Sequence, residues 1–161
     1  MRNPVARVLV SRLAAGIMIA TAGTAHAAVV LDCGDLAPTE ALIEPWEENT
    51  RTFSRGSIRL AAIDLGDPPC CPQHFIVTLP ANMYGGRICA LVARSVLVPN
   101  GWTRVGIGEA EASRPATGGL RLTVPVYGYD PTTGGADTTN RQTISVRVRQ
   151  AAGTVELDTA Q

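Results

Sequence analysis

In the stretch LRLTVPVYGY, residues 120–129, the aliphatic side chains of residues 120, 122, 124 and 126 alternate with Arg121, Thr123, Pro125 and Tyr127. Successive side chains of a β-strand point to opposite faces, so a period of two predicts a strand with one buried side and one wet side. The buried side would carry Leu120, Leu122, Val124 and Val126. Pro125 cannot donate a backbone hydrogen bond, so we expect either an edge strand or a missing N–H that faces outward.

Similar β-rich runs lie on both sides of this stretch and are separated by short connections rich in Pro, Gly and Asn. No long amphipathic helix separates them, which favours antiparallel neighbours over a parallel βαβ layout. The predicted fold class is mainly all-β: a single antiparallel sheet folded into a small sandwich or open barrel. The other predicted strands cover residues 57–65, 74–80, 87–98, 102–108, 142–150 and 154–157.

The first 50 residues divide into two segments that differ in composition. Residues 1–27 have a basic start, an apolar run over 13–22 and a closing Ala25-His26-Ala27, which together predict a signal peptide cleaved near Ala27. Residues 28–50 form an acidic N-terminal arm, in which Pro38 and the following TEALIE favour one short helix that ends at Pro45. Residues 51–161 are then the antiparallel β domain, and the protein is expected to be periplasmic or secreted.

Composition argues against several classes of partner. Arginine is the only basic residue type besides histidine, no cluster of neighbouring basic residues occurs, and aromatic residues make up 4% of the chain. Binding to nucleic acid depends on clustered positive charge, so no nucleic-acid partner is predicted. No second apolar run of spanning length follows the leader, so no transmembrane segment is predicted in the mature chain.

All four cysteines lie beyond the leader, at Cys33, Cys70, Cys71 and Cys89. An exported chain meets an oxidising compartment, so an even count predicts two disulfides. Adjacent cysteines in extended backbone point to opposite sides and should reach different partners. A hairpin of residues 74–80 and 87–98 favours Cys71–Cys89 with Cys33–Cys70. The swapped pairing, Cys70–Cys89 with Cys33–Cys71, differs by only one residue of register and stays open.

A metal-binding or thiol-active site is the alternative use of the same region. Cys70, Cys71, His74 and Cys89 are ligand types that suit zinc or cuprous ion. The usual pair of Cys-x-x-Cys spacings is absent, however, and oxidation competes for the thiols. We therefore predict no metal and no cofactor. No serine lies in a nucleophile elbow that His74 could serve, so no catalytic residues are predicted.

Other polar groups have simpler interpretations. Glu109 and Glu111 could form a carboxylate pair, but nearby arginines favour ion pairing. The segment from Asp130 to Asp137 has too few oxygens for calcium and is predicted to be a hairpin loop. A row of arginines on the wet faces of two strands could recognise an acidic partner. These are Arg121, Arg147 and Arg149.

Three quoted stretches carry a family resemblance: ENTRTFSRGSIRLAAIDLGDPPCCPQHFIVTLP (48–80), ICALV (88–92) and LRLTVPVYGYDPTTGG (120–135). In these stretches the chain resembles small exported β-rich proteins of GC-rich Gram-negative bacteria. The resemblance implies a periplasmic or secreted β-domain and no particular activity.

The resulting hypothesis is a non-enzymatic exported β-domain, stabilised by two disulfides, that binds a protein or a cell-envelope component. One alternative is the metal-binding or thiol-active protein described above. Another is a small-ligand carrier with a pocket inside the curved sheet near Trp102. If the protein is a binding domain, we expect Trp102 and Trp46 to be packing anchors. If it is a small-ligand carrier, we expect them to line a groove.

Overall fold

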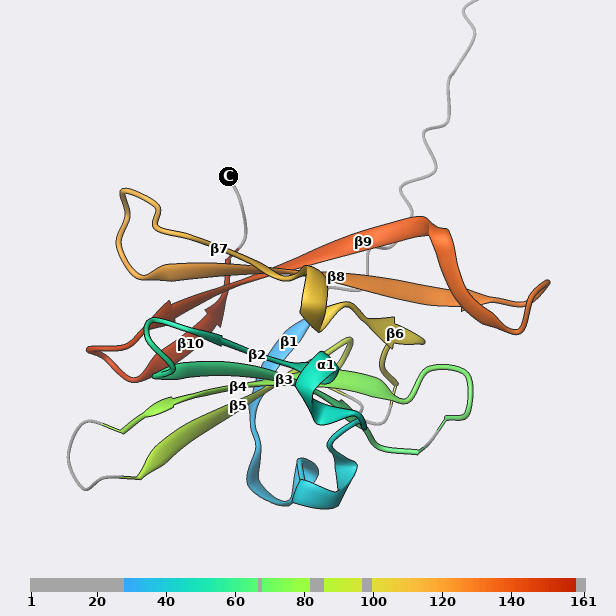
Figure 1. The fold of residues 1–161 in the computed structure, drawn as a ribbon, viewed down its shortest axis with the longest axis horizontal. Coiled ribbons are helices and arrows are strands. Elements are labelled where there is room, and N and C mark those ends of the chain that lie inside the picture. The colour runs from blue at the N-terminus through green and yellow to red at the C-terminus, as the bar shows by residue number, and fades with distance from the viewer. Residues whose placement is uncertain (1–27, 67, 82–85, 97–99, 159–161) are drawn as a thin grey trace, which may run out of the picture.

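The computed structural model describes residues 28–158, apart from residue 67 and the segments 82–85 and 97–99. The predicted signal peptide therefore lies outside the described residues. Two antiparallel sheets face each other and form a sandwich (Figure 1). The predicted all-β class and sandwich architecture are confirmed. The strands divide into two sheets, and an isolated bridge between Gln73 and Trp102 links the first sheet to the chain entering the second.

Sheet 1 contains five strands in the order β1-β5-β4-β3-β2. Consecutive strands from β2 to β5 pair as antiparallel neighbours, as short connections predict, while β1 pairs with β5 at the far edge. The bounds are β1 Val29–Asp32, β2 Thr50–Phe53, β3 Ile58–Asp64, β4 Gln73–Pro80 and β5 Arg87–Ala93.

Sheet 2 has the order β10-β9-β8-β6, and β7 also pairs with β8. Its centre is the long β8–β9 hairpin, which projects beyond the rest of the sandwich on the right of Figure 1. The bounds are β6 Arg104–Val105, β7 Glu111–Ser113, β8 Leu120–Asp130, β9 Gly135–Arg149 and β10 Thr154–Leu157.

Pro125 lies inside β8, which has neighbours on both sides. Its carbonyl accepts a 2.8 Å hydrogen bond from Gly106 N–H, so its nitrogen also faces the β6 side. There β6 has ended at Val105, and β7 begins only at Glu111. The missing N–H therefore falls where the neighbouring chain bends away, which agrees with the second of the two expectations for Pro125.

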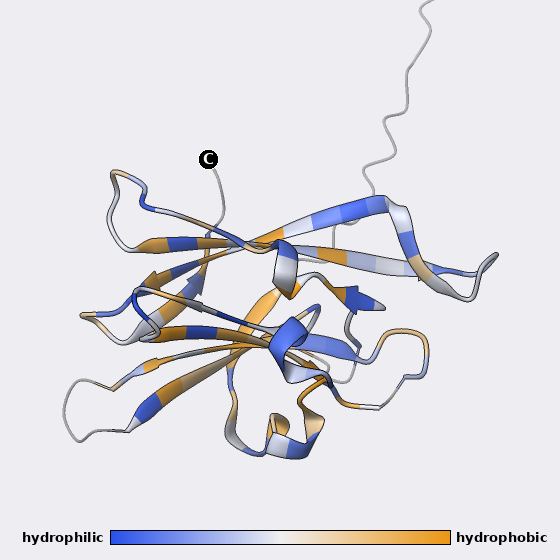
Figure 2. Cartoon of the chain, viewed as in Figure 1, coloured by the Kyte–Doolittle hydropathy of each residue, from blue (hydrophilic) through white to orange (hydrophobic). Residues whose placement is uncertain are grey.

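The hydrophobic core lies between the sheets. The apolar set predicted for residues 120–129 is fully or almost fully buried and packs against Leu60, Phe75 and Val77 of sheet 1. Figure 2 shows the alternation of hydrophobic and hydrophilic positions along the strands. Trp102 is 2% exposed, and its ring lies 6.2 Å from that of Phe75 in a stacked arrangement. Trp102 is thus a packing anchor, and its side chain fills the region where the small-ligand hypothesis expected a pocket.

A second, smaller cluster covers part of the outer face of sheet 1. The N-terminal arm folds back after β1 through two 3-10 turns, η1 (Gly34–Leu36) and η2 (Thr39–Ala41). The buried members of this cluster are Cys33 and Ala41 of the arm and Ile63 and Leu91 of sheet 1. The helix expected to begin at Pro38 is reduced to η2, and the only α-helix of the arm, α1 (Trp46–Asn49), begins after Pro45. Pro45 fits the start of a helix because its missing N–H would have no intrahelical partner there.

Candidate functional site

All four cysteines are paired, but neither predicted connectivity is correct. One disulfide joins Cys33 to Cys89, with 5.5 Å between the Cα atoms, and the other joins the adjacent Cys70 and Cys71. The first pairing follows from β1, which was not predicted as a strand. β1 pairs with β5 so that Asp32 lies opposite Ala90, and the next residue of the arm then meets Cys89.

The Cys70–Cys71 pair lies in a tight turn rather than in extended backbone. Cys71 N–H donates to the Pro68 carbonyl at 3.0 Å, which closes the turn. The expectation that adjacent cysteines point apart assumed a strand-like backbone and fails here for that reason. The turn is anchored to the chain before β6, because Thr103 Oγ1 donates to the Cys70 carbonyl at 2.8 Å.

The alternative metal or thiol site is not assembled. Cys89 lies opposite Thr78 on β4, four residues along the strand from His74, which is about 13 Å at the usual rise of a strand. His74 is fully buried and contacts Trp102 edge-on, with 6.4 Å between the ring centroids. Within the described part of the chain, no three His, Cys, Asp or Glu residues stand close enough to hold a metal ion.

Glu109 is engaged in a surface network rather than paired with Glu111. Its carboxylate accepts hydrogen bonds from Arg104 at 2.8 Å and from Tyr127 Oη at 2.9 Å. The Arg104 guanidinium also lies over the Tyr127 ring, 4.1 Å from its centroid. Glu109 ends the turn η3 (Ile107–Glu109), whereas Glu111 is exposed on β7. This network holds the chain between β6 and β7 against β8.

The predicted hairpin between Asp130 and Asp137 is present, but its loop is shorter than expected, because β8 ends at Asp130 and β9 already begins at Gly135. Asp130 accepts hydrogen bonds from the backbone and hydroxyl of Thr132 and from the hydroxyl of Thr133. Asp137 does the same for Thr139. These bonds lower the pKa of both carboxyl groups, the bond from the following threonine hydroxyl being the largest cause in each case. Both carboxylates are thus used to shape the hairpin.

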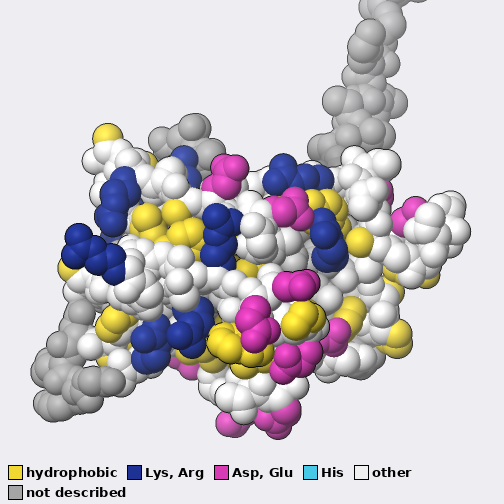
Figure 3. Space-filling view, in the orientation of Figure 1, with side chains coloured by type: hydrophobic (Ala, Val, Ile, Leu, Met, Phe, Trp, Pro, Cys, Tyr) yellow, Lys and Arg dark blue, Asp and Glu magenta, His cyan; other side chains and the backbone are white. Residues whose placement is uncertain are grey.

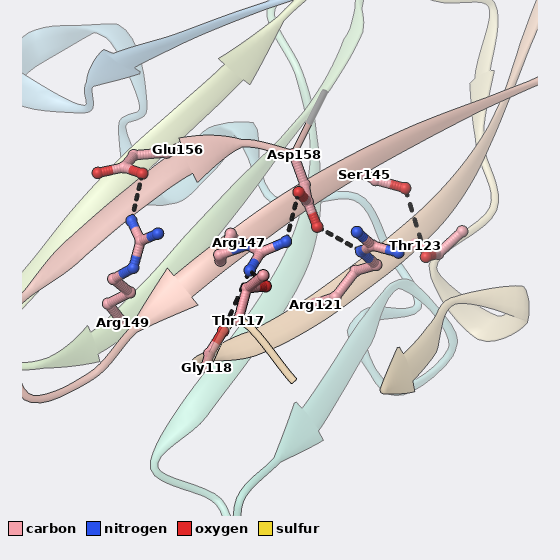
Figure 4. Close-up of polar contacts among 9 residues, drawn as sticks. All are labelled: Thr117, Gly118, Arg121, Thr123, Ser145, Arg147, Arg149, Glu156 and Asp158. Carbon is pink, nitrogen blue, oxygen red and sulfur yellow. Dashed lines mark hydrogen bonds and ion pairs between the residues drawn. The ribbon is translucent and has the colours of Figure 1, made fainter. Parts of the chain in front are cut away.

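The predicted arginine row does form, on the outer face of sheet 2 (Figure 4). Arg121 and Arg147 lie directly opposite each other on β8 and β9, where like charges repel. The Asp158 carboxylate lies between them and accepts hydrogen bonds from both guanidinium groups, that from Arg147 at 2.7 Å. Its side chain is 7% exposed. These contacts lower the pKa of Asp158, first through the hydrogen bond from Arg121 and then through that from Arg147.

Arg147 is the most enclosed of the three arginines. Only 8% of the residue is exposed, and its guanidinium also donates to Thr117 Oγ1 and to the Gly118 carbonyl. Arg149 points the same way as Arg147 on β9 but is more exposed and pairs with Glu156 of β10. The loop before β8 and the strand β10 therefore both attach to the row.

Two adjoining hollows border the row. The first, of about 440 Å³, lies on the outer face of sheet 2 and is lined mainly by polar side chains. The second, of about 400 Å³, opens at the end of the sandwich, where Ile58, Leu120 and Val148 of the core are its apolar floor. Thr117 and Arg149 line both, so the hollows form one continuous surface. Figure 3 shows hydrophobic atoms between basic groups on the left of the view.

Within the described part of the chain, four arginines and two carboxylates line this surface. We call the surface the arginine end, and its basic residues are Arg114, Arg121, Arg147 and Arg149. Asp158 and Glu156 neutralise part of the charge. Arg114 makes no ion pair with any residue that the structure describes. The arginine end therefore keeps an excess of positive charge beside an apolar floor.

Comparison with protein-family models, with curated proteins and with solved structures finds no match. Within the described residues, no helix is long and apolar enough to cross a membrane.

Sequence reasoning identified three of the four arginines and missed Arg114 and Asp158. Asp158 comes directly after the last strand, and no pattern in the sequence around it indicates that its carboxylate pairs with an arginine. The signal that could have found it is the pair Arg121 and Arg147, because two arginines on wet faces of neighbouring strands need a carboxylate between them once they are opposite. Arg114 precedes the PATGG loop, and its position depends on how that loop folds over β8.

Proposed function

We propose that this protein is an exported, non-catalytic binding domain that holds a negatively charged segment of a protein or polymer of the cell envelope at its arginine end. The disulfide-stabilised all-β sandwich is the scaffold for this role. Disulfides form and persist in oxidising compartments, which supports a periplasmic or secreted location. The sequence of residues 1–27 supports export in the same way.

One observation carries the proposal: among the residues that the structure describes, four arginines but two carboxylates line the adjoining hollows. A guanidinium presents paired N–H groups that match a carboxylate or phosphate with two parallel hydrogen bonds. Arg147 is nine-tenths buried and fixed by Thr117, Gly118 and Asp158, so the centre of the surface is ordered before any partner arrives. Ordering in advance lowers the entropic cost of binding.

The apolar floor narrows the kind of segment that fits. Ile58, Leu120 and Val148 can accept an aliphatic side chain, while Arg114 and Arg149 beside them can contact flanking acidic groups. The matching ligand is an acidic stretch that carries at least one exposed apolar residue. Exposed ion pairs are screened by salt, so binding of this kind weakens as ionic strength rises.

The experiment is a fluorescence anisotropy titration of the purified exported protein with a labelled peptide of alternating glutamate and leucine. A lysine–leucine peptide of equal length is the control ligand. We expect the protein to bind the acidic peptide and not the lysine–leucine peptide. The affinity should fall at 0.5 M salt, because the distance over which charges attract each other is already only about 10 Å at 0.1 M salt and becomes shorter as the salt concentration rises. The double variant Arg114→Ala/Arg149→Ala should weaken binding about tenfold or more.

Arg104→Ala is the matched control variant. Like Arg149, Arg104 is a half-exposed arginine in one surface ion pair, with 47% of its side chain exposed against 43%. Compared with the single variant Arg149→Ala, Arg104→Ala removes the same one positive charge, but away from the arginine end, and should leave the affinity unchanged. If Arg104→Ala and Arg149→Ala lose the same affinity for the acidic peptide, the effect comes from the net charge of the protein and not from the arginine end. If the protein binds the acidic and the lysine–leucine peptide equally well, the proposal is wrong.

A further inference from the structure

The outer face of sheet 1 is only partly covered by the N-terminal arm. Where the arm lies over it, Ile63 and Leu91 are completely buried. Beyond the arm, the same face continues into a groove of about 190 Å³, which we call the Trp46 groove. Its lining residues are Leu42, Trp46, Thr50, Arg59, Ala61, Ile76, Thr78 and Arg87.

Trp46 is held in place at the rim of this groove although half of it faces solvent. The residue is 52% exposed. Its backbone N–H donates to the Glu44 carboxylate at 3.1 Å, and its carbonyl accepts from Thr50 Oγ1 at 2.7 Å. An exposed tryptophan beside arginine is the composition found at the energetic centres of protein–protein interfaces. The groove is therefore a surface suited to a protein partner.

The charges around the groove are separated by sign. Arg59 and Arg87 line it on the sheet side, whereas Glu44, Glu47 and Glu48 lie exposed on the arm and α1. Figure 3 shows this arrangement in the lower half of the view, with hydrophobic atoms between basic and acidic groups. Within the described residues, Arg59 and these three glutamates form no ion pairs. The surface thus offers an apolar centre between a positive side and a negative side.

We propose that the Trp46 groove is covered by a second copy of this chain, as a two-fold symmetric dimer. A two-fold axis through the groove brings the acidic side of one copy against the basic side of the other, and it does so twice. The two Trp46 side chains then lie at the centre and extend the apolar cover that the arm begins. A surface with opposite charges on its two sides is complementary to itself, which is the reason to prefer a second copy over a different protein.

Among the described residues, the Trp46 groove and the arginine end share no lining residue. The arginine row lies on the outer face of sheet 2, and the Trp46 groove lies on the outer face of sheet 1. The two sheets face each other, so these outer faces point in opposite directions (Figure 1). A dimer would carry two arginine ends that stay open to partners.

The test is the mass of the purified exported protein, measured by sedimentation equilibrium over a range of concentrations. We expect a monomer–dimer equilibrium that shifts towards monomer at high salt. Trp46→Ala should raise the dissociation constant about 30-fold or more, as expected for an interface hot spot. Tyr129→Ala is the matched control, because it removes another half-exposed aromatic residue, 43% exposed, on the distant β8–β9 hairpin. Circular dichroism checks that each variant is folded.

A charge exchange makes the test specific to the two-fold arrangement. Arg59→Glu alone and Glu47→Arg alone should each be monomeric, because like charges then face each other twice. An equimolar mixture of the two variants should form a heterodimer in which every contact is between opposite charges. A wild-type protein that stays monomeric to about 1 mM, the range of the weakest specific complexes, overturns the proposal. So does a dimer that is unaffected by Trp46→Ala or by the charge reversals.

Discussion

The two disulfides should contribute very differently to stability, although each joins two cysteines of one small domain. Cys33–Cys89 spans a sequence separation of 56 and ties the N-terminal arm to β5. Restricting an unfolded chain by a loop of that length stabilises the folded state by about 4 kcal/mol. Cys70–Cys71 has a sequence separation of 1 and closes no chain loop, so its contribution through the unfolded state should be close to zero.

Urea unfolding of two double variants measures the difference. Cys33→Ala/Cys89→Ala should lose about 4 kcal/mol of unfolding free energy, together with any packing contributed by the buried Cys33. Cys70→Ala/Cys71→Ala should lose less than about 1 kcal/mol. Equal losses, or a larger loss in the second variant, would refute this reasoning. Mass spectrometry of non-reduced peptides provides the independent check, since a peptide that links Cys71 to Cys89 would mean that the pairing itself is different.

Three further predictions concern the site and the core. Contacts with Arg121 and Arg147 lower the pKa of Asp158 in the folded state. They therefore stabilise the fold at any pH above the pKa of the unfolded state, which is about 3.9. This stabilisation is lost as the pH falls through the lower pKa of the folded state. Asp158→Asn should therefore unfold more easily near neutral pH and lose less stability than the wild type between about pH 4 and pH 2, as followed by thermal unfolding. Gly101→Ala should destabilise the fold by about 1–3 kcal/mol or more in urea unfolding, because the added Cβ would clash with the Gln73 carbonyl oxygen, which is fixed backbone. Trp102→Ala should cost about 3–5 kcal/mol in the same assay because it empties the centre of the core, whereas an effect below 1 kcal/mol would contradict the packing described.

The sequence predicts the middle of each long strand well, because burial on one face leaves a visible period of two. The apolar positions of residues 120–129 and the valines of residues 142–150 face the core as expected. The start of β9 could not be predicted in this way. Residues from Gly135 to Thr143 are exposed or half-buried and polar, since the hairpin projects beyond the partner sheet and neither of its faces is fully buried.

Short strands were missed for a different reason. β1, β2 and β7 have three or four residues each, so that little of a period can show. β10 is equally short, but the preceding AAG turn at residues 151–153 sets it apart in the sequence. β1 had the largest consequence, because its pairing with β5 decides the partner of Cys33. The predicted strand over residues 102–108 is mostly irregular, since β6 ends before Gly106 and the turn η3 follows.

The candidate site was predicted in part. The spacing of Arg147 and Arg149 places them on one face of a strand, and that inference needs no tertiary information. The position of Arg121 opposite Arg147 depends on the register of β8 and β9, and the position of Asp158 depends on how β10 adds to the sheet edge. Register and edge pairing arise from packing across the whole sandwich, so one strand's sequence does not determine them.

The most direct test of the central functional claim is an amide chemical-shift titration of isotope-labelled protein with the acidic glutamate–leucine peptide. If the arginine end is the binding surface, the shifts should concentrate in residues 114–121 and 147–158 and saturate together. A titration with no shifts, or with shifts confined to sheet 1 around Trp46, would contradict the account.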